Sequence, residues 1–277
     1  MRLVTVRTKD GTRAGRLDGD RIELLPYRDV GELLADPGWG AAAETRGETI
    51  AVGDADFAPV VPKPNKIICL GLNYKAHIEE MGRELPSHPT LFAKYAVSLI
   101  GARDPIVLPP ESQAVDWEVE LAFVIGARAR RVKAADAARV VAGFTVFNDI
   151  SMRDWQVRTL QFLQGKTFER STPVGPAVVT LDESPGGIDA DLAISCEVDG
   201  EQMQKARTSD LLFPPAALVE YISTIMTLEP GDIVATGTPN GVGAGRNPPV
   251  FLKPGQTVRT TIEGVGELLN PTIAETV

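Results

Sequence analysis

The chain has 277 residues, of which 43% are hydrophobic and 23% charged, as in an ordinary soluble globular protein with one large domain and room for a small appendage. Its net charge of −9 argues against nucleic acid or an anionic membrane as the main partner, although a cation in a cleft can still attract a small anion. The two cysteines are too few for a disulfide framework, and neither a signal peptide nor a membrane-spanning run is evident, so we expect a cytoplasmic protein.

Residues 1–61 are expected to form a small N-terminal α/β domain. Leu3–Val6 predicts a strand, and residues 14–17 and 21–25 continue a short meander around the turn Asp18-Gly19-Asp20. One or two helical turns are predicted at 30–34. The boundary that follows is marked by three prolines: Pro59, Pro62 and Pro64.

Residues 62–277 predict a second, larger unit with many short strands and few helices. After a buried strand at 66–70, strands are predicted at 117–125, 143–148, 176–180, 191–198, 232–236 and 257–262. Helices are predicted at 134–141 and at 214–226, which opens with two prolines. This irregular alternation favours an α+β fold with a rolled or barrel-like mixed sheet.

Several enzyme classes lack their usual motifs in this sequence. There is no Gly-x-Gly-x-x-Gly after a first strand and no Gly-Lys-Ser/Thr loop, which argues against dinucleotide and nucleotide binding. There is also no Gly-x-Ser-x-Gly elbow of the kind that carries the nucleophile of many serine hydrolases.

Acidic residues form the most informative pattern in the chain. Asp116, Glu118 and Glu120 alternate, so on a strand they would share one face, and Asp149 follows the next predicted strand. The opposite face of the first strand is apolar, and beyond Glu120 the acidic face becomes apolar as well. Carboxylates gathered at such a partly dry place repel one another, and a hard divalent cation would offset that repulsion. The simpler alternative is a solvated strand face.

A second segment, residues 71–81, follows a buried strand and carries His77 and Glu80. These two side chains meet on one face if the segment is helical. A carboxylate beside an imidazole can orient it and raise its basicity, which suits a general base that acts on water. The alternative is a surface turn with an incidental histidine.

Four further side chains are candidates for substrate contacts. Arg153 and Gln156 could share a helical face and bind a substrate carboxylate. Lys166 follows a glycine and could reach into a cleft, although most such lysines are solvated. Thr238 belongs to a glycine-rich turn that could hold an anion or be an ordinary tight turn.

The chain resembles the fumarylacetoacetate hydrolase family over about residues 62–277. The resemblance is carried by six blocks in a fixed order: Gly-Leu-Asn-Tyr-x-x-His-x-x-Glu at 71–80, Glu-x-Glu at 118–120, Asn-Asp-x-Ser-x-Arg-Asp-x-Gln at 148–156, Gly-Lys-x-Phe at 165–168, Gly-Thr-Pro-x-Gly-Val-Gly at 237–243 and Gly-x-Gly-x-Leu-x-Asn at 264–270. One departure is Ala76, where an acid often stands. A further upstream acidic ligand found in the large eukaryotic members has no counterpart that we can place.

This resemblance implies a metal-dependent enzyme with the family's mixed β-roll. One Mg²⁺ or Mn²⁺ per subunit would be held by Glu118, Glu120 and Asp149. The resemblance also implies a homodimer and a segment around 74–90 that closes over bound substrate. Tyr74, in the first block, is expected to contact that substrate.

The implied reaction is cleavage of a C–C bond in a 2,4-diketo acid such as fumarylpyruvate or acetylpyruvate. His77, oriented by Glu80, would activate water, Lys166 would steady the developing oxyanion, and a pyruvate enolate would leave. The same enolate serves oxaloacetate decarboxylation and isomerisation of 2-hydroxyhepta-2,4-diene-1,7-dioate, which are the alternatives within enzymes. A non-catalytic binding protein is the alternative outside them, and metal-dependent turnover would discriminate.

Overall fold

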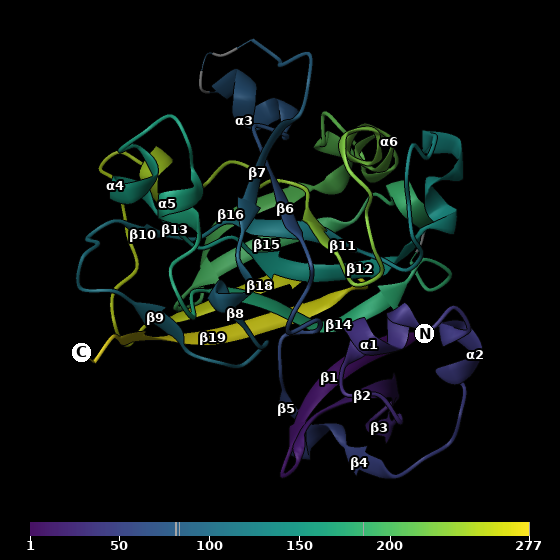
Figure 1. Cartoon of the computed structure of the whole chain (residues 1–277). Coiled ribbons are helices and arrows are strands. Elements are labelled where there is room, and N and C mark those ends of the chain that lie inside the picture. Colours follow the sequence, from purple (N-terminus) through teal and green to yellow (C-terminus); the bar gives the residue numbers. More distant parts are fainter. Residues whose placement is uncertain (81, 83, 185, 277) are drawn as a thin grey trace.

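The computed structural model describes residues 1–80, 82, 84–184 and 186–276, and for His77 and Glu80 it describes the backbone alone. A large mixed sheet and a five-stranded sheet form the body of the molecule (Figure 1). The described ranges contain no helix long and apolar enough to cross a membrane.

The large sheet joins strands from both ends of the sequence. Its main path runs, in spatial order, through β4 (Thr49–Ala51), β3 (Arg21–Leu24), β2 (Gly11–Asp18), β1 (Arg2–Thr8), β14 (Thr172–Thr180), β12 (Val141–Asn148), β11 (Val119–Ile125), β17 (Ile233–Ala235), β6 (Ile67–Gly71) and β7 (Thr90–Lys94). Off this path, β5 (Asp56–Phe57) pairs with β1 and β8 (Leu99–Ile100) pairs with β14.

The five-stranded sheet packs against the large one. Its order is β16 (Glu201–Arg207), β15 (Ala193–Val198), β18 (Thr257–Ile262), β19 (Gly266–Ala274) and β9 (Ile106–Leu108). Buried side chains from both sheets belong to one hydrophobic cluster, with Leu121 and Phe144 on the large sheet and Val258 and Leu268 on the smaller one. A separate two-stranded pair is formed by β10 (Val115–Asp116) and β13 (Ser151–Met152).

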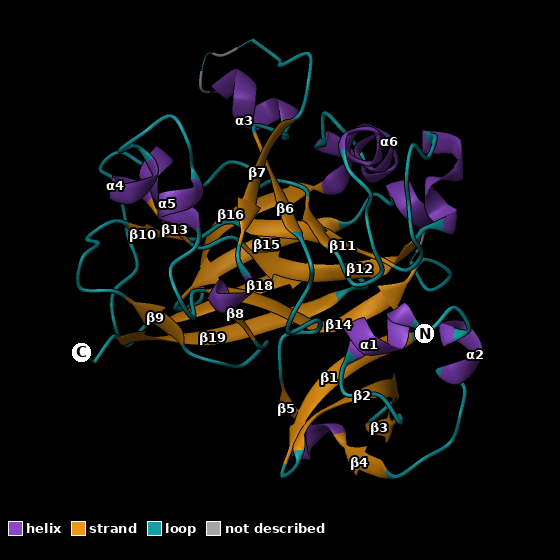
Figure 2. Cartoon of the chain, viewed as in Figure 1, coloured by secondary structure: helices purple, strands orange, loops and turns teal. Residues whose placement is uncertain are grey.

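Helices are short and lie outside the sheets (Figure 2). They are α1 (Val30–Ala35), α2 (Trp39–Ala42), α3 (Lys75–Glu80), α4 (Arg153–Gln156), α5 (Leu163–Lys166) and α6 (Pro215–Ile225). Short 3₁₀ helices occur at Val52–Asp54, Ala96–Ser98, Ala134–Arg139, Gly187–Asp189, Thr208–Asp210 and Gly243–Gly245. In Figure 1, α3, α4 and α5 are drawn above the sheets, and the strands β1 to β4 extend below them.

The predicted α+β fold is confirmed, and each strand predicted for the larger unit is present, with unchanged bounds at 257–262 and shifted ends elsewhere. The helix predicted at 134–141 is wrong in type and length. It is a 3₁₀ segment that ends at Arg139, because Val141 already belongs to the buried strand β12. β1 pairs with β14, so the N-terminal strands continue the large sheet, and a separate domain at 1–61 stays a prediction.

Candidate functional site: a buried carboxylate group

Three buried carboxylates meet at the end of two paired strands. β11 and β12 run antiparallel with Val119 opposite Asn148, so Glu118 and Asp149 lie beside each other just beyond the paired residues. The Asp149 amide donates to the Glu118 carbonyl oxygen at 2.9 Å. Oxygen atoms of Glu118, Glu120 and Asp149 lie within 4.8 Å of one another, and all three residues are buried. The predicted metal ligands are therefore brought together.

The prediction that Asp116 shares one face of a single strand with Glu118 and Glu120 is wrong. The strand is interrupted at residues 117–118, and Asp116 belongs to β10. Its carboxylate is fully buried and accepts hydrogen bonds from the amides of Gly243 at 2.7 Å and Ala244 at 3.0 Å, and from Arg153 Nε at 2.8 Å. A Cβ at Gly243 would lie 2.8 Å from Asp116 Oδ1 and 1.9 Å from the Val250 carbonyl oxygen, so only glycine fits there. Asp116 thus joins Arg153 to the glycine-rich loop 241–246.

Two predicted cations surround the carboxylate group. Lys166 Nζ, at the end of α5, lies 2.6 Å from Glu118 Oε2 and 2.7 Å from Asp149 Oδ2. Arg153 Nη1 lies 2.7 Å from Glu118 Oε1 and donates to Gln156 Oε1 at 2.9 Å. Burial lowers the pKa of Lys166, but Asp149 and Glu118 outweigh it and raise that pKa above its ordinary value. Lys166 is therefore a cation near neutral pH that holds its protons and donates hydrogen bonds.

Lys94 is a site residue that the sequence analysis missed. It ends β7, and its Nζ donates to Asp149 Oδ1 at 2.6 Å and to the Ile150 carbonyl oxygen at 3.3 Å. Burial raises the pKa of Asp149, but Lys166 and Lys94 outweigh it and keep that pKa below its ordinary value. The available signal was a lysine at the end of an otherwise apolar segment, Leu91-Phe92-Ala93.

Glu120 differs from Glu118 and Asp149 in its charge pairing. Within the described part of the chain, no cationic side chain lies within ion-pair distance of its carboxylate. Its Oε2 accepts from the Gly237 amide at 2.8 Å, while its buried Oε1 has no hydrogen-bond partner. Gly237 holds this position with φ +93°, and a Cβ there would lie 3.1 Å from Asn73 Cβ. Burial, Asp149 and Glu118 together raise the pKa of Glu120 well above its ordinary value. An unpartnered carboxylate oxygen beside two other carboxylates is a fitting donor set for a hard divalent cation.

A cavity of about 850 Å³ opens beside the group. Glu118, Lys166, Arg153, Gln156 and Thr238 line its polar part. Its other side is apolar and carries two strongly exposed side chains, Val157 at 77% and Leu160 at 97% exposure. Further lining residues are Leu70, Gly71, Leu72, Phe92, Thr159, Phe162, Asn240, Gly241, Val242, Ala244, Gly245 and Arg246. The cavity can therefore take a small molecule with a charged end and a less polar end.

The remaining predicted site residues divide into three groups. Thr238 lies in the cavity wall, where its hydroxyl donates to the Val119 carbonyl oxygen at 2.9 Å and accepts from Gln204 Nε2 at 2.8 Å. Tyr74 is fully buried, is not among the lining residues, and has a hydroxyl without a hydrogen-bond partner. The side chains of His77 and Glu80 lie outside the described residues, although their backbone belongs to α3 as predicted.

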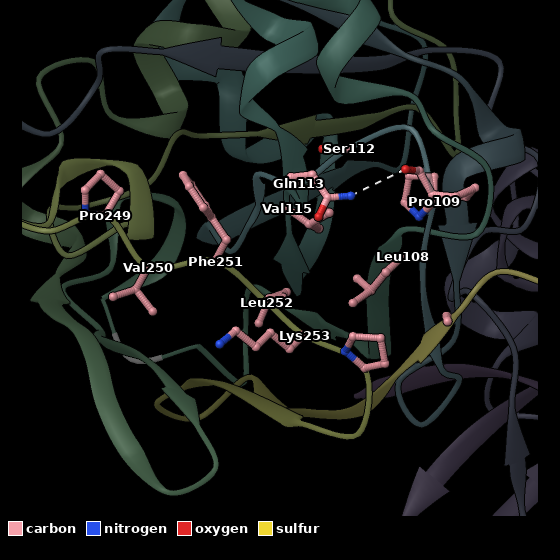
Figure 3. A pocket seen from close by; sticks show the side chains of 13 residues that line it. Leu108, Pro109, Ser112, Gln113, Val115, Pro249, Val250, Phe251, Leu252 and Lys253 are labelled. Atoms are coloured by element: carbon pink, nitrogen blue, oxygen red, sulfur yellow. Dashed lines mark hydrogen bonds between the residues drawn. The ribbon is translucent and has the colours of Figure 1, made fainter.

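A second hollow of about 510 Å³ lies near the C-terminal strand (Figure 3). Prolines and apolar side chains dominate its wall, among them Leu108, Pro249 and Phe251. Lys253 is its one ionisable lining residue within the described ranges. The described lining residues include no carboxylate, imidazole or thiol that could ligate a metal.

Comparisons with known proteins identify the family of the chain. The family model "Fumarylacetoacetate (FAA) hydrolase C-terminal" matches residues 66–273. The mitochondrial oxaloacetate tautomerase Fahd2a of Rattus norvegicus is 47% identical over 218 residues, which are 78% of this chain and 69% of the rat protein.

Two solved structures show the same fold over nearly the whole chain. The fumarylacetoacetate hydrolase of Exiguobacterium antarcticum has a TM-score of 0.87 at 30% identity and covers 99% of this chain and 100% of its own. A 5-carboxymethyl-2-hydroxymuconate delta-isomerase from Mycobacterium smegmatis has a TM-score of 0.83 at 33% identity, with the same coverage of both chains. The chain therefore belongs to the fumarylacetoacetate hydrolase family, a family of enzymes that includes hydrolases, isomerases and tautomerases.

Proposed function

We propose that the chain is a divalent-metal-dependent enzyme that converts a 2-oxo acid through its enolate. Its main reaction, in this proposal, is the tautomerisation of oxaloacetate. The observation that carries this proposal is the buried group Glu118, Glu120 and Asp149 at the charged end of a cavity that also holds Lys166 and Arg153. We favour oxaloacetate over other substrates because the rat relative at 47% identity is named an oxaloacetate tautomerase.

The three carboxylates would hold Mg²⁺ or Mn²⁺, each through oxygen atoms of the kind that these ions prefer. When bound, such an ion acts as a Lewis acid that stabilises negative charge on a substrate oxygen. A divalent cation would offset the charge of the buried carboxylates most directly at Glu120 Oε1, which has no hydrogen-bond partner.

The protein's own cations would orient the substrate. Lys166 has three N–H donors and spends two on Glu118 and Asp149, so one remains for an enolate oxygen. Arg153 is already fixed by Asp116, Glu118 and Gln156 through Nε and Nη1, so its Nη2 would donate to a substrate carboxylate. Apolar side chains such as Phe92 and Phe162 also line the cavity and would contact the less polar part of a substrate.

Tautomerisation needs a proton removed from C3 and a proton delivered to the oxygen at C2, and it consumes no water. Hydrolysis of an acylpyruvate starts from the same charged site but needs an activated water, for which His77 and Glu80 stay our predicted base. The hydrolase of Exiguobacterium antarcticum supports this second candidate. Oxaloacetate decarboxylation would use the same enolate and release CO₂.

One assay separates these candidates. The enol absorbance of oxaloacetate and of acetylpyruvate is followed in the ultraviolet with purified protein, with Mg²⁺ or Mn²⁺ and then with excess chelator, while pyruvate is measured separately. Faster equilibration of oxaloacetate without pyruvate supports the tautomerase. Pyruvate from acetylpyruvate supports the hydrolase, and pyruvate from oxaloacetate supports the decarboxylase. The absence of any metal-dependent change would contradict the proposal and favour a binding protein.

A further inference from the structure

We propose that Arg246 binds a second anionic group of the substrate, so that the site selects 2-oxo dicarboxylates over 2-oxo monocarboxylates. This inference rests on the proposed function and names its substrate class. Arg246 lines the same cavity as Glu118, Lys166 and Arg153, and it is contributed by the glycine-rich loop.

The charge pairing of the cavity sets Arg246 apart. Lys166 is paired with Glu118 and Asp149, and Arg153 is paired with Asp116 and Glu118. Among the described residues, Arg246 has no carboxylate within ion-pair distance, and its buried Nε has no hydrogen-bond partner. A half-buried guanidinium without an anion is costly, and an anionic ligand would remove that cost.

Arg246 is held in place without using most of its donors. Its Nη2 donates to the Met203 carbonyl oxygen at 3.1 Å, and its Cζ lies 5.9 Å from the centre of the buried Trp117 ring. The guanidinium has five N–H donors, and this single hydrogen bond occupies one of them. The side chain is therefore oriented by contacts that leave a fork available to a carboxylate.

The loop geometry puts Arg246 within reach of a small substrate bound at the charged end. The Ala244 amide and Arg153 Nε both donate to Asp116 Oδ2, at 3.0 Å and 2.8 Å. Arg246 follows Ala244 by two residues, so their Cα atoms are at most about 7.6 Å apart. Because Arg153 and Arg246 line one cavity, the proposal assigns one carboxylate of a four-carbon diacid to each.

The test compares two substrates of equal length. Oxaloacetate and 2-oxobutyrate differ by a carboxylate in place of a methyl group, and enolisation of each is measured by exchange of the C3 hydrogens in D₂O with Mg²⁺ present. Arg246→Gln should raise KM for oxaloacetate by about 10-fold to 100-fold, as expected for a lost charge-assisted hydrogen bond, and change kcat/KM for 2-oxobutyrate less than about 2-fold. Arg246→Lys should restore part of the preference because it keeps the charge.

A matched control removes a nearby arginine that does not line the cavity. Arg158 stacks on Trp155 with its Cζ 3.4 Å from the ring centre, and Arg158→Gln should leave the preference for the diacid unchanged. An equal loss for both substrates in Arg246→Gln would assign Arg246 to loop structure alone and overturn the inference, as would an unchanged preference.

Binding of unreactive analogues keeps the inference testable if the proposed reaction fails. Malate and 2-hydroxybutyrate are titrated calorimetrically into wild type and Arg246→Gln with Mg²⁺ present. A preference for malate that disappears in the variant supports Arg246 as the anion contact even without turnover. No preference for malate in the wild type would overturn the inference.

Discussion

The two hollows of the described chain differ in chemistry far more than in size. The cavity beside Glu118 is lined by carboxylate, ammonium, guanidinium and amide groups, whereas the hollow beside Leu252 is lined mainly by proline and aliphatic side chains. Buried charges are expensive, so a fold retains them where they have partners or bind a ligand. We therefore expect substitutions in the charged cavity to lower catalytic activity. Substitutions in the apolar hollow should instead lower the free energy of unfolding.

The largest expected effect is loss of a metal ligand. Glu118→Ala removes one carboxylate of the group and the partner of both Lys166 and Arg153. Turnover should fall by about 10²–10³, in the range for losing transition-state charge stabilisation. Steady-state rates at saturating Mg²⁺ check this prediction, and a variant that keeps wild-type rates would remove Glu118 from the site.

The next effect concerns the apolar hollow and should appear in stability alone. Leu252 is buried in the main hydrophobic cluster, so Leu252→Ala should lower the free energy of unfolding by about 2–4 kcal/mol. Urea denaturation measures this loss. The kcat/KM of the folded protein should stay within about 2-fold of wild type, and a selective loss of activity would break the contrast between the hollows.

Asp116→Asn tests the link between Arg153 and the glycine-rich loop. The amide of asparagine carries donors that oppose Arg153 Nε and the loop amides, so Arg153 should lose its fixed position. We expect kcat/KM to fall by about 10-fold to 100-fold. Metal affinity should change little because Asp116 is outside the ligand group.

A neighbouring acid offers the control for this prediction. Asp154 follows Arg153 on α4, and its carboxylate accepts from Ser112 Oγ at 2.7 Å, outside the metal group. Asp154→Asn should have a much smaller effect on kcat/KM. Equal losses in the two variants would mean that α4 is merely unfolded by either change.

The smallest expected effect is a gain of stability in Glu120→Gln. Burial and the neighbouring acids raise the pKa of Glu120 in the folded protein, so its ionised form destabilises the metal-free protein as pH rises through and above the ordinary pKa of 4.5. Glutamine removes this titration. The metal-free variant should therefore be more stable than wild type by about 1–2 kcal/mol near pH 8, with a difference that shrinks toward pH 4.

Denaturation at several pH values in excess chelator measures that difference. With Mn²⁺ added, the order should reverse, because the amide is a poorer metal ligand than the carboxylate. A variant that is less stable than wild type at every pH would contradict the role assigned to the unpartnered Glu120 oxygen.

The sequence was sufficient for the fold class and for bringing Glu118, Glu120 and Asp149 together. Alternating acids followed by an apolar stretch indicated a strand that enters the interior, and Glu118 and Glu120 lie there. It was not sufficient for Asp116, because period-two alternation assumes a continuous strand. At the break, the Glu118 amide donates a hydrogen bond to Asn148 Oδ1 at 3.0 Å, and the Val119 amide donates to Gln204 Oε1 at 2.9 Å. These side-chain hydrogen bonds replace strand pairing there.

Long-range partners were the other missing information. Lys94 and Asp149 are 55 residues apart, and nothing local in either segment indicates that β7 brings a lysine against that acid. Arg246 follows the glycine-rich turn of Thr238, which was expected either to hold an anion or to be an ordinary tight turn, and no local pattern marked Arg246 itself. Its place over Trp117 depends on the packing of the loop against β16 through Met203.

Metal binding is the measurement that tests the central claim most directly. Mn²⁺ is titrated calorimetrically into chelator-treated wild type and into Glu118→Ala, with circular dichroism to confirm that both are folded. The account predicts about one Mn²⁺ per wild-type chain and a loss of affinity of at least about 10-fold in the variant. No binding to the folded wild type, or equal binding by the two proteins, would contradict a metal site formed by Glu118, Glu120 and Asp149.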